Sequence, residues 1–246
     1  MFGQHSTKPD EIDPSNTFNN FQTNPFDDIK IRTAFVRKVF SILSVQLLAT
    51  FGIVLIFTFV EPIKSYTRNH IWFYITSYIV FLVFYLILIC VKSVARKFPL
   101  NFIFLGILTL TMGIMLGNVA AYHNTYTVIL AMSTTVAVSF GMTLLSLQTK
   151  YDLTKKLYGP LFAALICLIM FGIFAIIFRS SILTAVYGFI GALIFSLFIA
   201  VDVQLIVGGR TIQISEEDYI FGALALYMDI VNLFIMLLTF IGAVNN

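Results

Sequence analysis

The chain has 246 residues, of which 59% are hydrophobic and 11% are charged, and its mean hydropathy is +0.94. Soluble domains carry about 25% charged residues, so this composition excludes an ordinary soluble protein and indicates a membrane protein. The formal net charge of +3 is small and dispersed, which argues against a nucleic-acid-binding protein.

Polar residues are concentrated at the start of the chain. Residues 1–30 are rich in Asn, Asp, Thr and Ser, and this composition predicts a disordered tail. Residues 31–246 are predicted to form the transmembrane domain. A hydrocarbon core requires about 20 apolar residues per helix. Seven stretches meet this length, so the sequence predicts an all-α, seven-helix membrane protein with spans at residues 39–60, 71–91, 100–121, 127–147, 161–178, 182–207 and 219–244.

The basic residues predict how these spans are oriented. Lys and Arg are enriched in cytosolic loops, and here twelve of them fall on one side of the predicted spans and three on the other. The three on the sparse side are Lys64, Arg68 and Arg179. The N-terminus is therefore expected in the cytosol, and the C-terminus on the lumenal or extracellular side.

Small and hydroxyl residues recur within two spans. Gly113 and Gly117 form a small-xxx-small pair, which predicts close helix packing inside the bundle. The fourth span carries a hydroxyl stripe, which would line a polar path or bond neighbouring helices and its own backbone. The second role is the usual one for Ser and Thr in membranes. The stripe consists of Thr135, Ser139, Thr143 and Ser146.

Two aspartates lie inside the last two spans. Asp202 and Asp229 are each surrounded by apolar residues, and no Lys or Arg lies well inside any span to neutralise them. A carboxylate at membrane depth is costly, so its presence suggests a role in ion or proton handling. The negative charges indicate that the ion is a cation. A purely structural hydrogen bond between helices is the alternative.

Helix geometry brings the two aspartates toward similar depths. Asp202 lies about 9 Å of helix rise before Gly208, and Asp229 lies about 16 Å after Asp218. In an antiparallel hairpin both would lie toward the cytosolic side. The face around Asp229 is small and polar, and it includes Asn232, which could hydrogen-bond the carboxylate or offer its carbonyl oxygen to a cation. The two carboxyls are expected to share a proton, which predicts a response to pH.

Several longer motifs occur in a recognisable order. They include residues 31–47 (IRTAFVRKVFSILSVQL), 96–101 (RKFPLN), 148–152 (QTKYD), 200–208 (AVDVQLIVG), 214–224 (ISEEDYIFGAL) and 226–234 (LYMDIVNLF). In these motifs the chain resembles the transmembrane Bax-inhibitor-motif family, in its lifeguard branch. The resemblance covers nearly the whole chain from Ile31 onward.

The resemblance implies a bundle with the last helix central and a pH-sensitive calcium leak through ER, Golgi or endolysosomal membranes. It also implies protection of cells from apoptosis, with apoptosis-regulating membrane proteins as partners. The family's di-aspartyl sensor maps onto Asp202 and Asp229, which the resemblance also implies as transient calcium ligands. Its arginine latch at the end of the second span maps onto Arg96, although Lys97 or Lys92 could serve. No cofactor is expected, and some relatives carry a glutamate in the second span that residues 71–91 lack.

Two other functions fit parts of the sequence. Two aspartates on adjacent helices could activate a water in an intramembrane protease, but the Gly-x-Gly-Asp context of such enzymes is missing before Asp229. No enzymatic activity is therefore predicted. A non-conducting membrane protein that suppresses apoptotic signalling through its partners is the other alternative. Calcium flux in liposomes distinguishes it from a channel.

Overall fold

The computed structural model describes residues 25–208 and 212–245, with side chains for residues 29–91, 93–208 and 212–245. Most of the predicted disordered tail lies outside the described residues. Residues 25–30 of this tail are helical and form the start of the first long helix. The described residues contain no strand. The helices are α2 (Pro25–Phe59), α3 (Glu61–Asn69), α4 (Ile71–Cys90), α5 (Lys92–Arg96), α6 (Leu100–Ala121), α7 (Thr125–Gln148), α8 (Leu153–Phe178), α9 (Ser181–Val207) and α10 (Tyr219–Val244).

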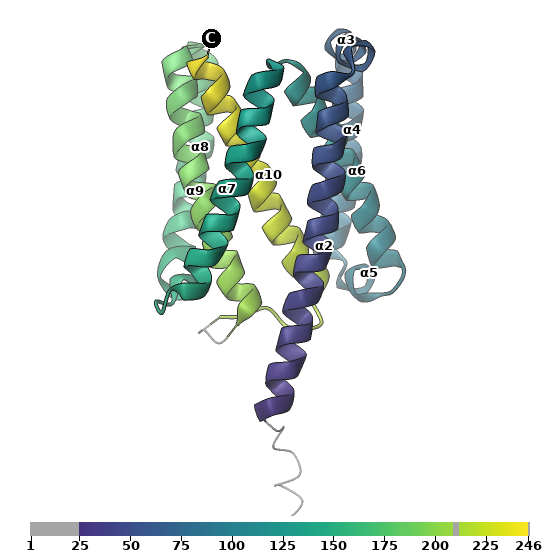
Figure 1. Ribbon diagram of the computed structural model, residues 1–246, viewed down its shortest axis with the longest axis vertical. Helices are drawn as coiled ribbons and strands as arrows, with labels where there is room; N and C mark the ends of the chain where they lie inside the picture. Colours follow the sequence, from purple (N-terminus) through teal and green to yellow (C-terminus); the bar gives the residue numbers. More distant parts are fainter. Residues whose placement is uncertain (1–24, 209–211, 246) are drawn as a thin grey trace, which may run out of the picture.

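Seven of the described helices are long and apolar enough to cross a membrane, which confirms the predicted number of spans. They run alternately up and down, and the two short helices α3 and α5 lie at opposite ends of the bundle (Figure 1). We call the end that contains the α9–α10 loop the proximal face. The opposite end, which contains the C-terminus of α10, is called the distal face.

Some helices extend beyond the predicted spans. The fifth span was expected to begin at Leu161, but α8 begins at Leu153 and includes Pro160. The Asp152 carboxylate accepts a hydrogen bond from the backbone N–H of Lys155 and so caps the start of this helix. The additional turns contain the charged residues Lys155 and Lys156, so the predicted apolar span did not include them. At its N-terminal end, α8 is therefore longer than the apolar stretch that crosses the membrane.

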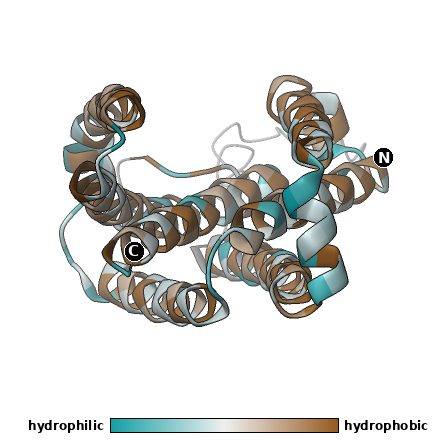
Figure 2. Ribbon diagram, turned by 90° about the horizontal axis from the view of Figure 1, so that it is seen from above, coloured by the Kyte–Doolittle hydropathy of each residue, from teal (hydrophilic) through white to brown (hydrophobic). Residues whose placement is uncertain are grey.

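The helices differ strongly in burial. In the most apolar 18-residue stretch of each helix, 67% of the residues of α9 are buried. The share is 50% in α6 and in α10, and 17% in each of α4, α7 and α8. Helix α10 packs against α9, α7, α2 and α6, which agrees with a central last helix. Helix α9 shares this central position. Hydrophobic residues dominate the long helices when the bundle is seen from above, and hydrophilic residues gather in the short segments at its ends (Figure 2). The outer faces of the peripheral helices expose large apolar side chains, as expected for contact with lipid.

Close packing of α6 against α2 confirms the prediction made from the small-xxx-small pair. A Cβ atom added to Gly113 would lie 2.7 Å from Cδ1 of Ile53, and one added to Gly117 would lie 2.7 Å from Cγ of Phe57. Both contacts are shorter than carbon atoms tolerate, so a larger residue at either position would force the Ile53 or Phe57 side chain to move. The pair is used within the bundle.

Candidate functional site

The two intramembrane aspartates meet at the interface of α9 and α10. These helices form the most extensive helix pair in the molecule. The side chains of Asp202 and Asp229 are hydrogen-bonded to each other, and the sequence had placed the two residues at similar depths. Helix α10 crosses the bundle obliquely (Figure 1). Asp202 is buried, with 8% of its surface exposed, and Asp229 is partly exposed.

A hydrogen bond between two carboxyl groups has a chemical consequence. A carboxylate can only accept, so one of the two groups must carry a proton in order to donate. The Oδ2 atom of Asp229 is buried and has no hydrogen-bond partner among the described residues. A buried acceptor without a partner is rare in proteins. A hydrogen bond between the two carboxyl groups thus requires a shared proton, and it leaves the Asp229 Oδ2 atom without a partner among the described residues.

Polar groups on neighbouring helices lie around α10 close to the pair. The Tyr85 side chain on α4 lies close enough to Asp229 to interact electrostatically. Tyr227, two residues before Asp229, is fully buried, and its hydroxyl lies 2.7 Å from the Thr50 hydroxyl on α2. Asn232 is half-buried and makes no hydrogen bond with the described part of the chain, so the structure does not join its amide to the aspartates.

Gln204 fixes the segment of α9 that follows Asp202. Its side-chain oxygen accepts from the backbone N–H of Leu153 at 2.9 Å, and its nitrogen donates to the Tyr151 carbonyl at 3.1 Å. The Ser146 hydroxyl on α7 also donates to the Ala200 carbonyl at 2.7 Å. These bonds attach α9 to the α7–α8 connection within one turn of Asp202. The backbone position of Asp202 is thus held by contacts outside the α9–α10 pair.

Arg32, near the start of α2, holds the end of α9. Its guanidinium donates to the carbonyl oxygens of Leu205 at 2.8 Å and Val207 at 3.1 Å, and also to that of Ile206. The last carbonyls of a helix have no partner within the helix, and a cation near them also interacts favourably with the helix dipole. Only 14% of the Arg32 side chain is exposed. Arg32 therefore acts as a cap supplied by a distant helix.

The same guanidinium also holds the loop that follows α9. It donates to the Ile214 carbonyl at 2.6 Å and to Oε1 of Glu216 at 2.9 Å. The hydrogen bond from Arg32 lowers the pKa of Glu216 from its ordinary value. Gly208 permits this arrangement, because its φ is +77° and an added Cβ would lie 2.7 Å from Nε of Arg32. The end of α9 and the return of the chain toward α10 are thus joined at Arg32.

Arg96 lies at the other end of the same loop. Its guanidinium binds Asp218 through two hydrogen bonds of 2.9 and 3.1 Å, and it forms a 2.8 Å ion pair with Glu217. These residues directly precede α10. The structure therefore does not bring Arg96 to Asp202 and Asp229, and its role as a latch on the pair stays a prediction. In the conformation described, Arg96 attaches the end of the second span to the start of α10.

The hydroxyl stripe of the fourth span serves mainly structural bonds. The hydroxyls of Thr135 and Thr143 donate to carbonyls of their own helix, and Ser146 bonds α9 as described above. The buried Ser139 hydroxyl has no hydrogen-bond partner in the described part of the chain. The structural interpretation therefore holds for three of the four residues.

The described residues contain no group of three or more His, Cys, Asp or Glu side chains that could hold a metal ion. Calcium commonly takes six to eight oxygen ligands, so two carboxyl groups do not make a high-affinity site. The donor set of Asp202 and Asp229 suits transient contact with a passing cation. Calcium at this pair stays a prediction.

Comparison with known proteins agrees with the sequence motifs. Residues 32–246 match the family model described as inhibitor of apoptosis-promoting Bax1. The chain is 42% identical to human Protein lifeguard 3 over 231 residues, which are 92% of this chain and 74% of the relative. It is also 35% identical to mouse Protein lifeguard 4 over 218 residues, which are 88% of each chain. The chain belongs to the Bax-inhibitor-motif family, as its motifs suggested.

Membership in this family agrees with the architecture. The family description, inhibitor of apoptosis-promoting Bax1, indicates an anti-apoptotic membrane protein. The seven apolar helices make this chain a multi-pass membrane protein in contact with the lipid bilayer.

Two residues that position the pair were not recognised from sequence. Gln204 had a detectable signal, because an isolated amide in an apolar helix needs a hydrogen-bond partner. Arg32 had none, since it lies among several basic residues before the first span and its partners are mostly backbone carbonyls about 175 residues away. Every residue has a backbone carbonyl, so the sequence does not show which carbonyls accept a hydrogen bond from Arg32.

Proposed function

We propose that this protein is a pH-sensitive calcium leak channel of intracellular membranes in which the Asp202–Asp229 pair controls the path. The observation that carries the proposal is the hydrogen bond between these two carboxyl groups inside the bundle. In a chain with seven apolar spans, a pair of acids without a basic partner is suited to protons and cations. Calcium is the substrate under this proposal, and no resident cofactor takes part.

The shared proton provides a mechanism for the response to pH. When the proton leaves, the hydrogen bond is replaced by repulsion between two adjacent carboxylates. The α9–α10 contact must then rearrange or accept a cation between the carboxylates. Calcium requires ionised oxygen ligands, so it competes with the shared proton. Arg32 and Arg96 would oppose this rearrangement, because they hold the two ends of the loop that connects the helices.

Calcium flux into liposomes that contain the purified protein tests the proposal. The wild type should conduct, and its flux should change between about pH 5 and 8, where a buried coupled pair can titrate. Replacing both aspartates (Asp202→Asn with Asp229→Asn) should flatten this profile. Glu61→Gln is the matched control, because Glu61 is an exposed acid at the opposite end of the bundle.

Two results of this flux experiment would contradict the proposal, one in the double variant and one in the wild type. A wild-type pH profile would mean that the aspartates are structural. Absence of flux in correctly folded wild-type protein would instead favour a non-conducting protein that suppresses apoptotic signalling through membrane partners.

The proposal also places the N-terminus in the cytosol and the protein in ER, Golgi or endolysosomal membranes. Support comes from the uneven distribution of Lys and Arg between the two ends of the bundle. Reaction of a cysteine placed at Asn245 with an impermeant reagent in sealed vesicles tests the orientation, with Cys90 and Cys167 replaced. Labelling from the cytosolic side would contradict it.

A further inference from the structure

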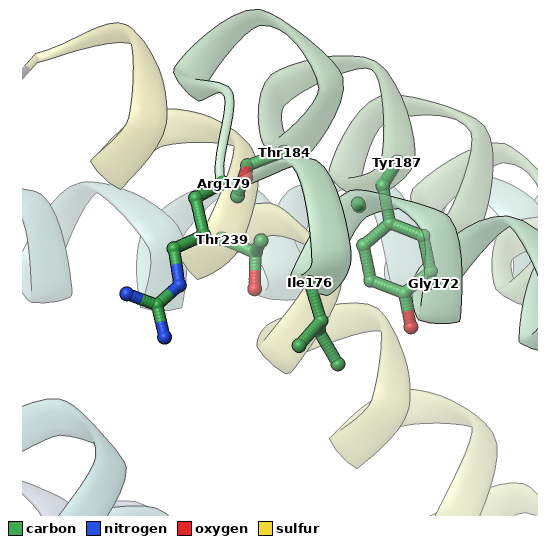
Figure 3. Close-up of a pocket in the computed structure, with 7 residues that line it drawn as sticks. Gly172, Ile176, Arg179, Thr184, Tyr187 and Thr239 are labelled. Carbon is green, nitrogen blue, oxygen red and sulfur yellow. The ribbon is translucent and has the colours of Figure 1, made fainter.

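Two adjoining cavities lie at the distal face, where α8 ends, α9 begins and α10 approaches its end. Their volumes are about 440 Å³ and 390 Å³. Arg179, Thr184 and Thr239 line both cavities. Figure 3 shows the Arg179 side chain beside Thr239, on the side away from the ring of Tyr187. We call the two adjoining cavities together the hollow. The cavity lined by Ser181 is its cationic end, Arg179 lies where the two cavities adjoin, and the Tyr187 ring lines the other end.

Arg179 is a positive charge without a counter-charge. Its side chain is exposed, and it makes no hydrogen bond or ion pair within the described part of the chain. The two other basic residues of the distal face have partners. Lys64 lies 3.9 Å from Glu61, and Arg68 donates to the Ala121 carbonyl at 2.7 Å. No acidic residue is among the described lining of either cavity, so an anion would meet no repulsion there.

The cationic end of the hollow also offers hydrogen-bond donors. Ser181, the first residue of α9, lines this end, and its hydroxyl has no partner in the described part of the chain. The preceding Ser180 makes no side-chain cap, so the first N–H groups of α9 are also free of side-chain acceptors. Free donors beside a guanidinium suit the oxygens of a phosphate group.

The other end of the hollow is apolar and continues onto the lipid-facing surface. Gly172, Ile176 and Tyr187 line it, and Ile176 is 76% exposed. Gly172 precedes Arg179 by seven residues of α8, which places it about 10 Å deeper in the membrane. The hollow thus changes from cationic to apolar along the membrane normal, as a phospholipid changes from headgroup to acyl chain.

We propose that this hollow binds an anionic phospholipid. The phosphate would contact the Arg179 guanidinium and the Ser181 hydroxyl, and the start of an acyl chain would lie along Ile176 and Tyr187. A zwitterionic headgroup would fit less well, because the hollow offers no carboxylate to its ammonium group. A soluble phosphate shares the headgroup chemistry but would leave the apolar end unfilled.

Native mass spectrometry of the detergent-purified full chain tests the proposal. Phosphatidylglycerol, an anionic lipid, is added in one series and phosphatidylcholine in another at equal concentration. The wild type should retain one phosphatidylglycerol more strongly than phosphatidylcholine. Arg179→Gln should weaken this binding about tenfold, as expected for loss of a charge-assisted bond. Arg37→Gln, which removes an exposed arginine at the other end of the bundle, should have no effect.

A second variant and a second ligand separate the lipid from a soluble anion. Ile176→Trp fills the exposed apolar end without changing any charge, and it should weaken phosphatidylglycerol binding. Inorganic phosphate alone should not raise the melting temperature at concentrations where the lipid does. Equal retention of both lipids, no effect of Arg179→Gln, or equal stabilisation by phosphate would each overturn the proposal.

Discussion

The guanidinium of Arg32 donates to the carbonyl oxygen of Leu205 at 2.8 Å, across 173 residues of sequence. Leu205 lies three residues after Asp202, so this bond fixes the helix end closest to the acidic pair. The same guanidinium binds the loop that leads to α10. A residue near the start of α2, before the predicted first span, therefore helps to fix the geometry of the two aspartates.

Replacing Arg32 with glutamine should destabilise the protein and raise its resting calcium leak. The variant removes the guanidinium from the carbonyls of Ile206 and Val207, while that of Leu205 keeps the Ile214 N–H. The loss of charged hydrogen bonds should lower the free energy of unfolding by about 2 kcal/mol. Thermal unfolding in detergent and flux in liposomes are the two measurements. Arg37→Gln, five residues further along α2 at an exposed position, is the control. Equal behaviour of the two variants would show that Arg32 does not hold α9.

Replacing Arg96 with alanine should raise the resting leak about threefold, as expected for loss of an exposed ion pair at the start of α10. Asp218→Asn should have a similar effect. The double variant should leak no more than either single variant, because each removes the same bond. High salt should reduce all three differences. Additive effects would mean that Arg96 acts elsewhere, for instance directly on the aspartates.

His123 should make the stability of the distal face depend on pH. Burial lowers the pKa of His123 from its ordinary value of 6.5. Below about pH 6.5 the unfolded chain therefore takes up a proton that the folded chain resists, so stability falls as the pH drops. Arg179 lines the same cavity and disfavours a second cation there. The ring also packs on Gly242, where an added Cβ would lie 2.7 Å from it.

Melting temperatures measured between pH 5 and 7.5 test this prediction. His123→Phe keeps a ring and should remove most of the decline toward acid. His70→Gln, at an exposed histidine, should retain it. A decline that is unchanged in His123→Phe would assign the pH dependence to other groups.

Replacing Gly188 with alanine should disrupt the packing of α9 against α10. An added Cβ would lie 2.6 Å from the backbone nitrogen of Phe240 and 2.8 Å from the Met236 carbonyl, and backbone atoms cannot move aside easily. We expect a loss of about 1 to 3 kcal/mol in unfolding free energy. Gly106→Ala is the control, because nothing lies within 4 Å of its added Cβ. It should be neutral or stabilising by up to about 1 kcal/mol. Similar melting temperatures for both variants would contradict the close approach.

The sequence by itself determined the class of the protein and its unusual residues. Apolar length predicted seven spans, because the thickness of a bilayer sets the length of a helix that crosses it. The aspartates stood out because a charge inside an apolar run is costly and therefore rare. Helix periodicity placed Asp229 on a small, polar face. These inferences need only local pattern, and the length of α8 shows their limit, since charged residues can extend a helix beyond its apolar part.

Only the tertiary structure decided which groups meet. The sequence placed Asp229 and Asp202 at similar depths, but their hydrogen bond depends on how α10 packs against α9, which spacing along one helix does not give. Arg32 contacts carbonyls of α9, and every residue except proline offers the same donor and acceptor groups in its backbone. Arg96 was expected near the aspartates but binds Asp218, because its reach depends on how α5 meets the loop. Contacts between distant helices arise from packing, and packing is decided by the whole chain at once.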